Sequence, residues 1–244
     1  MDLRHGIYWK DSAESVDFSP AGPIEHLRDV ITVDYSNDYR PSVSPYLHSS
    51  TKRIFDIVIA TLLLIAASPL LLMIALAIKA TSEGPVIFRQ KRHSSEKTTF
   101  EILKFRSMHV DCGADPLVPQ AVKGDGRVTA IGRLIRRTSM DELPQLINVI
   151  RGEMSLIGPR PHAIAHDEKY MREIPTYVHR FLARAGITGL AQVSGARGAT
   201  PKLSDMQRRV QYDLEYIRTA SLALDCKILL LTAITELTGR TNAF

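Results

Sequence analysis

Two adjacent carboxylates, Asp141 and Glu142, are the side chains of this sequence best suited to chemistry. Arg136 precedes them, and Arg160 follows within Gly158–Pro161, where two prolines restrict the backbone. One carboxylate of such a pair can attack phosphorus while the other holds a divalent cation. The arginines would offset the repulsion between an attacking carboxylate and a diphosphate, which is about 4 kcal/mol per charge pair at about 4 Å in an effective dielectric of about 20.

The same pair also fits an ordinary helix start. Ser139 followed three residues later by Glu142 is a capping-box pattern, and acidic residues favour the positive end of a helix dipole. Pro144 would then lie in the first turn, or at the first position of a helix that begins later. Both interpretations can hold, because a helix N-terminus also attracts phosphate. The pair alone does not decide between them.

A short amphipathic helix is predicted directly after the pair. Apolar residues recur there at the spacing of one helical face, namely Leu143, Leu146, Ile147 and Ile150. Asp141, Gln145 and Asn148 fall together on another face of the same helix.

Two short strands, at residues 86–90 and 99–105, are predicted upstream, joined by a polar loop. Lys104 and Arg106 are two residues apart at the end of the second strand, so they share a face of extended chain. In isolation they are equally well interpreted as solvated charges at a strand end.

Residues 57–78 carry no charge and would form a helix about 33 Å long, enough to cross a bilayer core of about 30 Å. Ser68 and Pro69 lie at the middle, where proline breaks or kinks a helix. Positive charge flanks both ends, which would put both flanks in the cytoplasm. A re-entrant helix-break-helix satisfies both facts. These features alone slightly favour a spanning helix over a re-entrant one, and a buried helix of a soluble core ranks third.

The C-terminal part predicts two further helices. One starts at Thr200-Pro201 and runs through Tyr216, with threonine as the cap and proline at the first position. The second runs from near Ser221 to Gly239. It is too short and too charged to span a membrane comfortably, so it is expected to lie at the membrane surface or to pack on the core.

Other residues give weaker signals. His162 and His166 are four apart, but a zinc site needs a third ligand that the sequence does not offer clearly, so surface histidines are expected. Residues 185–198 form a glycine-punctuated loop that can approach a ligand closely.

Charge is divided unevenly along the chain. Residues 1–50 hold four Lys/Arg and eight Asp/Glu, while residues 51–244 hold 27 and 18, a net +9. A basic body suits anionic partners: nucleic acid, lipid headgroups or phosphorylated substrates. With only Cys112 and Cys226 there is no disulfide framework, which is compatible with a reducing compartment.

Ordered sequence blocks extend from about Lys52 to Leu237 and together resemble the small monotopic phosphoglycosyl transferases, bacterial sugar transferases that begin exopolysaccharide and glycan assembly. The blocks are Lys52-Arg-x-Phe-Asp56, Ser68-Pro69, Gly84-Pro-Val-x-Phe-Arg-Gln90, Lys104-Phe-Arg-Ser-Met108, Arg127-x-Thr-x-x-Gly132, Ser139-Met-Asp-Glu-Leu-Pro-Gln145, Asn148-Val-x-x-Gly152, Gly158-Pro-Arg-Pro161, Gly186-Ile-Thr-Gly189 and Asp213-x-x-Tyr216. One block would be weak; the ordered set is specific.

The resemblance implies transfer of a sugar 1-phosphate from a nucleotide diphosphosugar, expected to be a UDP-sugar, to undecaprenyl or another polyprenyl phosphate. It implies that Asp141 attacks and forms a covalent phosphosugar intermediate, and that Glu142 helps to bind Mg²⁺. The residues expected to handle phosphates are Lys104, Arg106, Arg136, Arg160 and Arg184.

The fold that the resemblance implies is α+β and mainly helical. It has a mobile acidic tail at residues 1–50, a re-entrant membrane helix at 51–80 that breaks at Ser68 and Pro69, and a cytoplasmic catalytic domain at 81–244 with a short β-hairpin, catalytic helices and interfacial C-terminal helices. The expected location is the cytoplasmic face of the bacterial inner membrane. Membrane lipids and downstream glycosyltransferases are the further partners expected.

Three departures from the family pattern lie away from the carboxylate pair. Ala185 stands where the family usually has proline, Ser194–Arg197 replaces an Asn-Gly-Arg-like element, and a hairpin glycine is absent near residues 93–95. The two loop changes concern donor-sugar recognition, and Arg197 is expected to be displaced.

Two other functions compete with the transferase. A non-catalytic membrane adaptor that recruits glycan-assembly partners would predict a damaged Asp-Glu or Gly-Pro-Arg-Pro element, and both are intact. A nucleic-acid binder fits poorly with a long uncharged segment and no reader motif, so no nucleic acid partner is expected.

Overall fold

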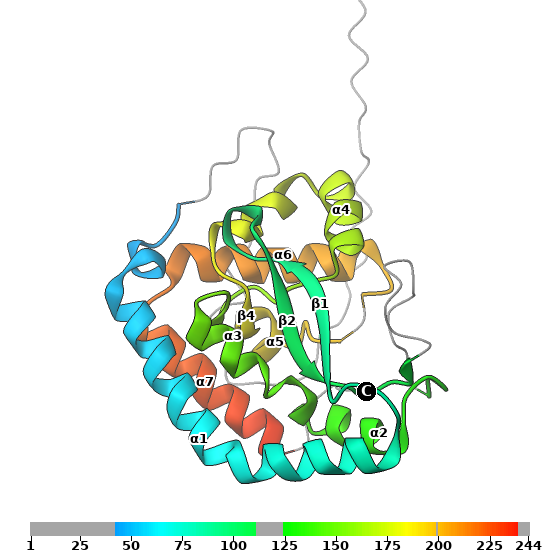
Figure 1. Ribbon diagram of the computed structural model, residues 1–244. Coiled ribbons are helices and arrows are strands. Elements are labelled where there is room, and N and C mark those ends of the chain that lie inside the picture. The colour runs from blue at the N-terminus through cyan, green and yellow to red at the C-terminus, as the bar shows by residue number, and fades with distance from the viewer. Residues whose placement is uncertain (1–41, 111–123, 199, 239–244) are drawn as a thin grey trace, which may run out of the picture. The chain divides into compact units, whose positions relative to one another are not determined.

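The computed structural model of the protein describes residues 42–110, 124–198 and 200–238 (Figure 1). Most of the predicted acidic tail and the predicted helix end at Gly239 lie outside these ranges. Within them the chain is mostly helical, with a short antiparallel strand pair and one long apolar helix. The prediction of a mainly helical α+β fold is confirmed at this level.

The long apolar helix is α1, Ser50–Thr81, which agrees within one residue at each end with the predicted segment. Ser49 caps its start by accepting a hydrogen bond from the Lys52 backbone N–H at 3.2 Å. Pro69 lies inside the helix, and the Ser68 hydroxyl donates to the Ile65 carbonyl at 2.8 Å. The helix bends along its length, so that it forms two arms (Figure 1). A proline explains a bend, because it lacks an N–H and its ring crowds the preceding turn.

The two arms pack against different partners. The first arm contacts α3, Gln145–Arg151, where the Arg53 guanidinium donates to the Val149 and Ile150 carbonyls at 2.6 and 2.7 Å. The second arm buries Ile74 and Ile78 in a cluster with Phe105 and Ile135. An arginine at the last carbonyls of α3 satisfies groups that the helix itself cannot.

Most of the α1 surface is nevertheless open. Only 11% of its most apolar 18-residue window is buried, and by length and composition the helix is able to cross a membrane. Its exposed large apolar side chains are Ile54, Val58, Leu62, Leu63, Ile65, Leu72, Met73 and Leu76. An apolar surface of this extent is typical of a membrane or protein contact.

The predicted hairpin is formed by β1, Ile87–His93, and β2, Thr99–Phe105, which pair antiparallel from Ile87 with Phe105 to His93 with Thr99. Asn148 of α3 fixes β2, because its side chain accepts from the Leu103 N–H at 3.0 Å and donates to the Glu101 carbonyl at 2.8 Å. The predicted polar face of α3 therefore serves partly to hold the hairpin.

A second pairing joins two sequence motifs. β3, Ser155–Ile157, runs parallel to β4, Gly186–Thr188. A Cβ added at Gly186 would lie 2.2 Å from the Gly158 backbone nitrogen, which leaves no room for a side chain. Glycine at these positions therefore allows the Gly158–Pro161 segment to lie against the Gly186–Gly189 segment.

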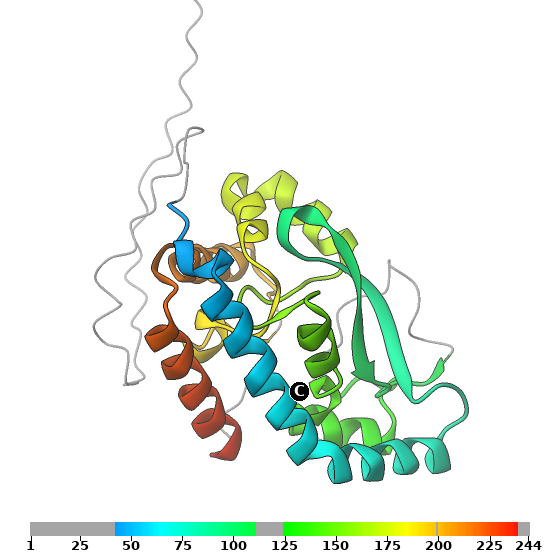
Figure 2. The ribbon, with the colours of Figure 1, turned by 60° about the vertical axis from the view of Figure 1, so that its left-hand side comes forward.

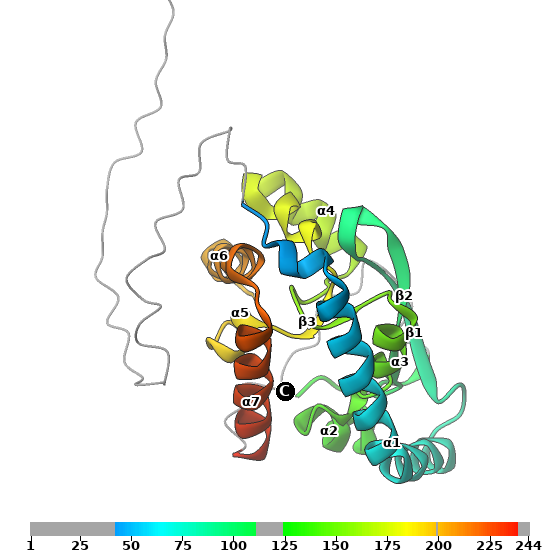
Figure 3. The same cartoon turned by 90° about the vertical axis from the view of Figure 1, so that its left-hand side faces the viewer.

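The remaining described helices are η2 (Pro45–His48), η3 (Ser95–Lys97), α2 (Ala130–Arg137), η5 (Met140–Glu142), α4 (Ile164–Glu173), η6 (Pro175–Leu182), α5 (Leu190–Val193), α6 (Leu203–Thr219) and α7 (Leu222–Leu237). α7 runs alongside the first arm of α1 (Figures 2 and 3). It buries Asp225 and Ile228 while Leu222, Leu230 and Ile234 stay exposed, so it both packs on the core and presents an apolar face.

Three predicted boundaries were wrong. β1 runs to His93, three residues beyond the predicted strand end at residue 90. α6 begins at Leu203 with Lys202 as its cap, because the Asp205 carboxylate accepts from the Lys202 N–H at 3.1 Å, so Thr200-Pro201 precedes the helix. Ordered structure also begins before residue 51. Leu47 is buried, and Ser44 donates to the Ile217 and Ala220 carbonyls at 2.9 and 2.7 Å.

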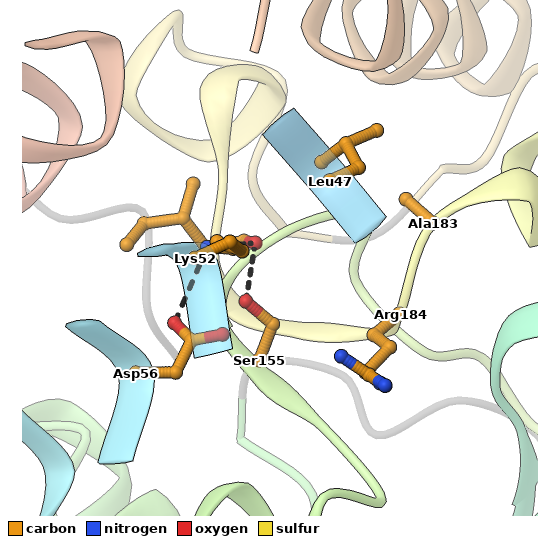
Figure 4. A pocket seen from close by; sticks show the side chains of 7 residues that line it. Leu47, Lys52, Asp56, Ser155, Ala183 and Arg184 are labelled. Atoms are coloured by element: carbon orange, nitrogen blue, oxygen red, sulfur yellow. Dashed lines mark hydrogen bonds and ion pairs between the residues drawn. The ribbon is translucent and has the colours of Figure 1, made fainter. Parts of the chain in front are cut away.

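A buried group of charged and phenolic side chains, here called the anchor cluster, joins the start of α1 to α6 and α7. Lys52 donates to Asp56 at 3.2 Å and to Asp225 at 2.6 Å. Asp225 also accepts from the Tyr46 and Tyr216 hydroxyls at 3.0 and 2.8 Å. Figure 4 shows Lys52 bonded to Asp56 beside the small pocket they help to line. The motifs at Lys52–Asp56 and Asp213–Tyr216 thus meet in a structural network.

Candidate active site

The chain enters the candidate site through a left-handed residue. Ser139, between α2 and η5, has φ +55°, a conformation that residues other than glycine rarely adopt. Its side chain caps no helix, so the capping box with Glu142 is not formed, and that interpretation was wrong. The Ser139 hydroxyl instead accepts a hydrogen bond from Arg197 at 2.7 Å. The left-handed backbone at Ser139 leads the chain out of α2 into the short η5 turn.

Glu142 is held by two cations. The Lys104 ammonium of β2 donates to one carboxylate oxygen at 2.7 Å, and the Arg160 guanidinium bonds both oxygens, reaching the second at 2.9 Å. A bidentate arginine–carboxylate pair is a strong and directional contact. Burial alone would raise the pKa of Glu142, but Arg160 and Lys104 hold that pKa well below its usual range. Glu142 is therefore an ionised group whose orientation is fixed.

Asp141 differs from its neighbour. Among the residues that the structure describes, no side chain is hydrogen-bonded to its carboxylate, although the residue is only partly exposed. Burial, and then the negative charge of Glu142, raises the pKa of Asp141 to about 6, against the opposing charges of Lys104, Arg136 and Arg160. An ionised, partly desolvated carboxylate that is not committed to a partner is suited to act as a nucleophile.

The carboxylate pair has acceptor positions left for a metal ion, although no larger ligand cluster surrounds it in the described residues. The described part of the chain contains no group of three or more His, Cys, Asp or Glu side chains arranged to hold one. Mg²⁺, however, commonly takes one or two carboxylates, with water and substrate phosphate completing its shell. Asp141 has both oxygens available, whereas Glu142 already accepts two bonds on one oxygen and one on the other. A carboxylate offers about four acceptor positions, so the pair fits Mg²⁺ with donor capacity to spare.

The structure brings some predicted phosphate-binding residues together and not others. Lys104 and Arg160 contact Glu142, and Arg136 lies close enough to lower the pKa of Asp141. Arg106 instead turns toward the end of α1, where it donates to the Ser82 carbonyl and hydroxyl, both at 2.9 Å, and to the Glu83 carbonyl.

Arg184 also lies apart from the carboxylate pair. It lines the pocket beside the anchor cluster, across from Lys52 and Asp56 (Figure 4). Its positive charge contributes to lowering the pKa of Arg53, an effect second to that of burial. Ser68 and Pro69 lie inside α1, where the Ser68 hydroxyl bonds the Ile65 carbonyl, and not in the carboxylate site.

Two side chains reach the site without having been assigned to it. Arg197, expected to be displaced, bonds Ser139 and pairs with Glu236 in the last turn of α7. Glu236 also contributes to raising the pKa of Arg160, so it lies near the Glu142 pair. The Asn-Gly-Arg-like element offered a signal for Arg197, but nothing local in the sequence distinguished Glu236.

A buried network supports Arg160 from behind. Arg180 donates to the Arg160 carbonyl at 2.7 Å and pairs with Asp213 at 2.7 Å. His162, expected at the surface, is buried and lies 2.6 Å from the Tyr177 hydroxyl, so that expectation was wrong. Burial and the surrounding arginines, with Arg180 first among them, hold the pKa of His162 well below its usual range. A neutral histidine therefore fills a polar core beneath the site.

Comparisons with known proteins agree with this arrangement. The sequence model of the family described as "bacterial sugar transferase" matches residues 47–239. A UDP-glucose:undecaprenyl-phosphate glucose-1-phosphate transferase of Caulobacter vibrioides is 53% identical over 188 residues, which cover 77% of this chain and 70% of that protein. A protein of the same name from Escherichia coli is 52% identical over 74% of this chain, and an exopolysaccharide production protein PSS of Rhizobium leguminosarum is 43% identical over 77%.

The lengths of these relatives differ. The match covers 39% of the Escherichia coli protein but 95% of the Rhizobium protein. The family match at residues 47–239 contains the carboxylate pair, its cations and the long apolar helix.

Proposed function

The chain belongs to the bacterial sugar transferase family, and from this premise we propose that it transfers a sugar 1-phosphate from a nucleotide diphosphosugar to undecaprenyl phosphate. The names of the similar proteins support both substrates and make UDP-glucose the first donor to test. The proposed product is a lipid-linked sugar that begins the assembly of an exopolysaccharide or a related glycan.

The observation that carries this proposal is the contrast within the carboxylate pair. Glu142 accepts three hydrogen bonds from Lys104 and Arg160, whereas Asp141 beside it has no hydrogen-bond partner among the described residues. In the first step the Asp141 carboxylate attacks the phosphorus that carries the sugar, and the bond to the nucleoside monophosphate breaks. In the second step an oxygen of the lipid phosphate attacks the same phosphorus and releases the free carboxylate.

The surrounding cations have a defined task in both steps. Lys104, Arg136 and Arg160 lie close enough to Asp141 to lower its pKa, so they also act on phosphate oxygens brought to it. They offset repulsion between the entering carboxylate and the diphosphate, which is the main electrostatic obstacle to attack. Arg106 and Arg184 have their predicted phosphate role only if they leave their present positions.

We further propose Mg²⁺ as the cofactor. Glu142, with one acceptor position remaining, and Asp141 would hold it together with the donor phosphates. When bound, the ion supplies charge neutralisation at the phosphoryl oxygens. Arg160 and Lys104 keep Glu142 ionised for this task, because a protonated carboxyl would be a poor ligand.

The proposed attachment to a membrane rests on α1. Its exposed apolar residues, together with exposed Leu230 and Ile234 of α7, support attachment to a membrane from which a lipid phosphate can reach the site. The bend of α1, together with the proline inside it, supports a re-entrant helix whose two ends stay on the cytoplasmic side of the inner membrane. Re-entry would hold Asp141 near the headgroups, and downstream glycosyltransferases would meet the product there.

The direct test is capture of the loaded enzyme. Purified protein is mixed with Mg²⁺ and a panel of nucleotide diphosphosugars that includes UDP-glucose, and its intact mass is recorded before undecaprenyl phosphate is added. We expect the mass of a sugar phosphate on the wild-type chain, located on Asp141 by fragmentation, and its loss when the lipid is supplied. Absence of the adduct with every donor, or an adduct on another residue, would contradict the proposal.

Re-entry has a separate test. Single cysteines introduced on either side of α1 are labelled from one face of sealed vesicles, and both flanks should react from the same face. Replacing Pro69 with Leu should straighten α1 toward a spanning helix and move one flank to the opposite face. Labelling of the two flanks from opposite faces in the unmodified protein would exclude the re-entrant arrangement.

A further inference from the structure

Ser139, Arg197 and Glu236 form a small polar cluster beside the nucleophile. Arg197 donates to the Ser139 hydroxyl at 2.7 Å and to the Glu236 carboxylate, and that hydroxyl lies 3.4 Å from the same carboxylate. The three residues come from the turn before η5, from the loop after α5 and from the last turn of α7. The side chains of Arg197 and Glu236 are only 17% and 27% exposed, so their pairing is partly protected from solvent.

The backbone conformation of Ser139 is the feature that this cluster can stabilise. A residue with a side chain is strained at φ +55°, and such a conformation persists only where the surroundings enforce it. The same residue begins the turn that carries Asp141, since the Ser139 carbonyl accepts from the Glu142 N–H at 3.2 Å. Relaxation of Ser139 would therefore displace both carboxylates of the pair.

Arg197 is itself fixed from behind. The buried Arg209 donates to the Ala196 carbonyl at 3.0 Å and to the Gly198 carbonyl at 2.7 Å, on either side of Arg197. Arg209 also lies 3.1 Å from the second ring nitrogen of His162, so the loop is tied to the buried network beneath Arg160. The guanidinium of Arg197 therefore projects from a rigid base toward Ser139.

We propose that Arg197 and Glu236 are positioning residues, which hold Ser139 in its left-handed conformation and thereby set the place of Asp141. This inference rests on the proposed role of Asp141 as the nucleophile. It gives the last turn of α7 a part in the reaction, because Glu236 orients the guanidinium that bonds Ser139. It also gives the loop that departs from the family pattern a task other than recognition of the sugar.

Glycine provides a specific test, because it adopts positive φ without strain and carries no hydroxyl. Ser139→Ala loses the bond to Arg197 but keeps the strain, whereas Ser139→Gly loses both. If the cluster serves to hold the turn, Ser139→Ala should slow single-turnover loading with UDP-glucose about tenfold, and Ser139→Gly should stay within about threefold of the wild type. Equal loss in the two variants would mean that the hydroxyl has another task, and the inference would be wrong.

The arginine and the glutamate are tested in the same way. Arg197→Gln and Glu236→Gln should each slow loading about as much as Ser139→Ala with little change in the KM for the donor, and adding Ser139→Gly to either should restore most of the rate. An Arg197 that bound substrate would instead raise the KM, and glycine at 139 would not rescue it. Arg172→Gln, an exposed arginine of α4, is the matched control and should load at the wild-type rate.

Thermal unfolding of the same variants keeps the inference testable without any donor. Ser139→Ala should unfold at a lower temperature than Ser139→Gly, and the loss of stability from Arg197→Gln should be smaller in the Ser139→Gly background. If the wild-type chain never forms the adduct, the proposed function is wrong, and the order of the unfolding temperatures still tests the positioning role. If the wild-type chain forms the adduct, but Ser139→Ala and Ser139→Gly do not differ in loading rate or unfolding temperature, only the positioning role is wrong.

Discussion

Two groups of acids and cations in this protein have similar composition and opposite character. In the anchor cluster, Asp225 accepts three hydrogen bonds, from Lys52, Tyr46 and Tyr216, and is buried completely. In the candidate site, Glu142 also accepts three, from Lys104 and Arg160, but its neighbour Asp141 accepts none from the described side chains. The anchor cluster is closed to substrate, whereas the candidate site keeps the Asp141 carboxylate available at a partly exposed position.

The difference shows how a structural ion network can be told from a reactive one. Asp56 of the anchor also has an oxygen without a partner, but that residue is 0% exposed, so no substrate phosphate can approach it. Burial raises the pKa of Asp225 in the anchor against the opposing effect of Lys52, as it does that of Asp141 against its cations. A perturbed pKa is therefore common to both groups, and accessibility with unfilled bonding capacity is what separates them.

The largest expected effect comes from changing Asp141, the available carboxylate of the candidate site. Asp141→Asn should reduce turnover by at least about a thousandfold, because an amide cannot attack phosphorus, while the protein still partitions into membranes. Release of nucleoside monophosphate measures the rate, and flotation with vesicles measures the partitioning. Monophosphate release at the normal rate would show that Asp141 is not the nucleophile.

The next effect concerns Glu142. Glu142→Gln should lower turnover about a hundredfold, because Lys104 and Arg160 lose the charge that they share. It should also raise the Mg²⁺ concentration at half-maximal turnover, because an amide is a poorer metal ligand than a carboxylate. A titration of Mg²⁺ against turnover separates the two consequences. An unchanged midpoint for Mg²⁺ in this variant would contradict the proposed part of Glu142 in metal binding.

A smaller effect follows from the pKa of Asp141. Because that pKa is about 6 and the ionised form attacks, kcat/KM for the donor should be flat above about pH 7 and fall about tenfold per unit below pH 6. A pH profile that stays flat to pH 5 would contradict this assignment.

The same shift affects stability. The raised pKa means that the folded state binds more protons than the unfolded state between about pH 4 and 6, so this group favours folding less as the pH rises through 6. The unfolding temperature of Asp141→Asn relative to the wild type should therefore increase across that range and level off above it. A difference that does not depend on pH would show that the carboxyl titrates normally.

The smallest effect on turnover belongs to the anchor cluster. Lys52→Met leaves Asp56 and Asp225 buried without their cation, which should destabilise the fold by about 3–5 kcal/mol. Turnover per folded molecule should stay within about threefold of the wild type. Lys79→Met, an exposed lysine of the same helix, is the control and should change neither quantity. A larger loss of turnover in folded Lys52→Met would mean that the two groups are coupled.

The sequence by itself determined the parts of this protein that local chemistry specifies. The uncharged run at residues 57–78 lies within α1, the two predicted strands form the hairpin, and ordered motifs identified the family. Each of these follows from residues close together in the chain, where periodicity and motif spacing carry the information.

Only the tertiary structure decided which cations meet which acids. Lys104 and Arg106 lie two residues apart on one strand, yet the first contacts Glu142 and the second the end of α1. His162 appeared to be a surface residue and lies in the core, and Arg197 reaches Ser139 from 58 positions along the chain. The physical reason is that side-chain pairing depends on how the strands, loops and helices pack, and residue spacing along one chain does not specify the partner that another element brings.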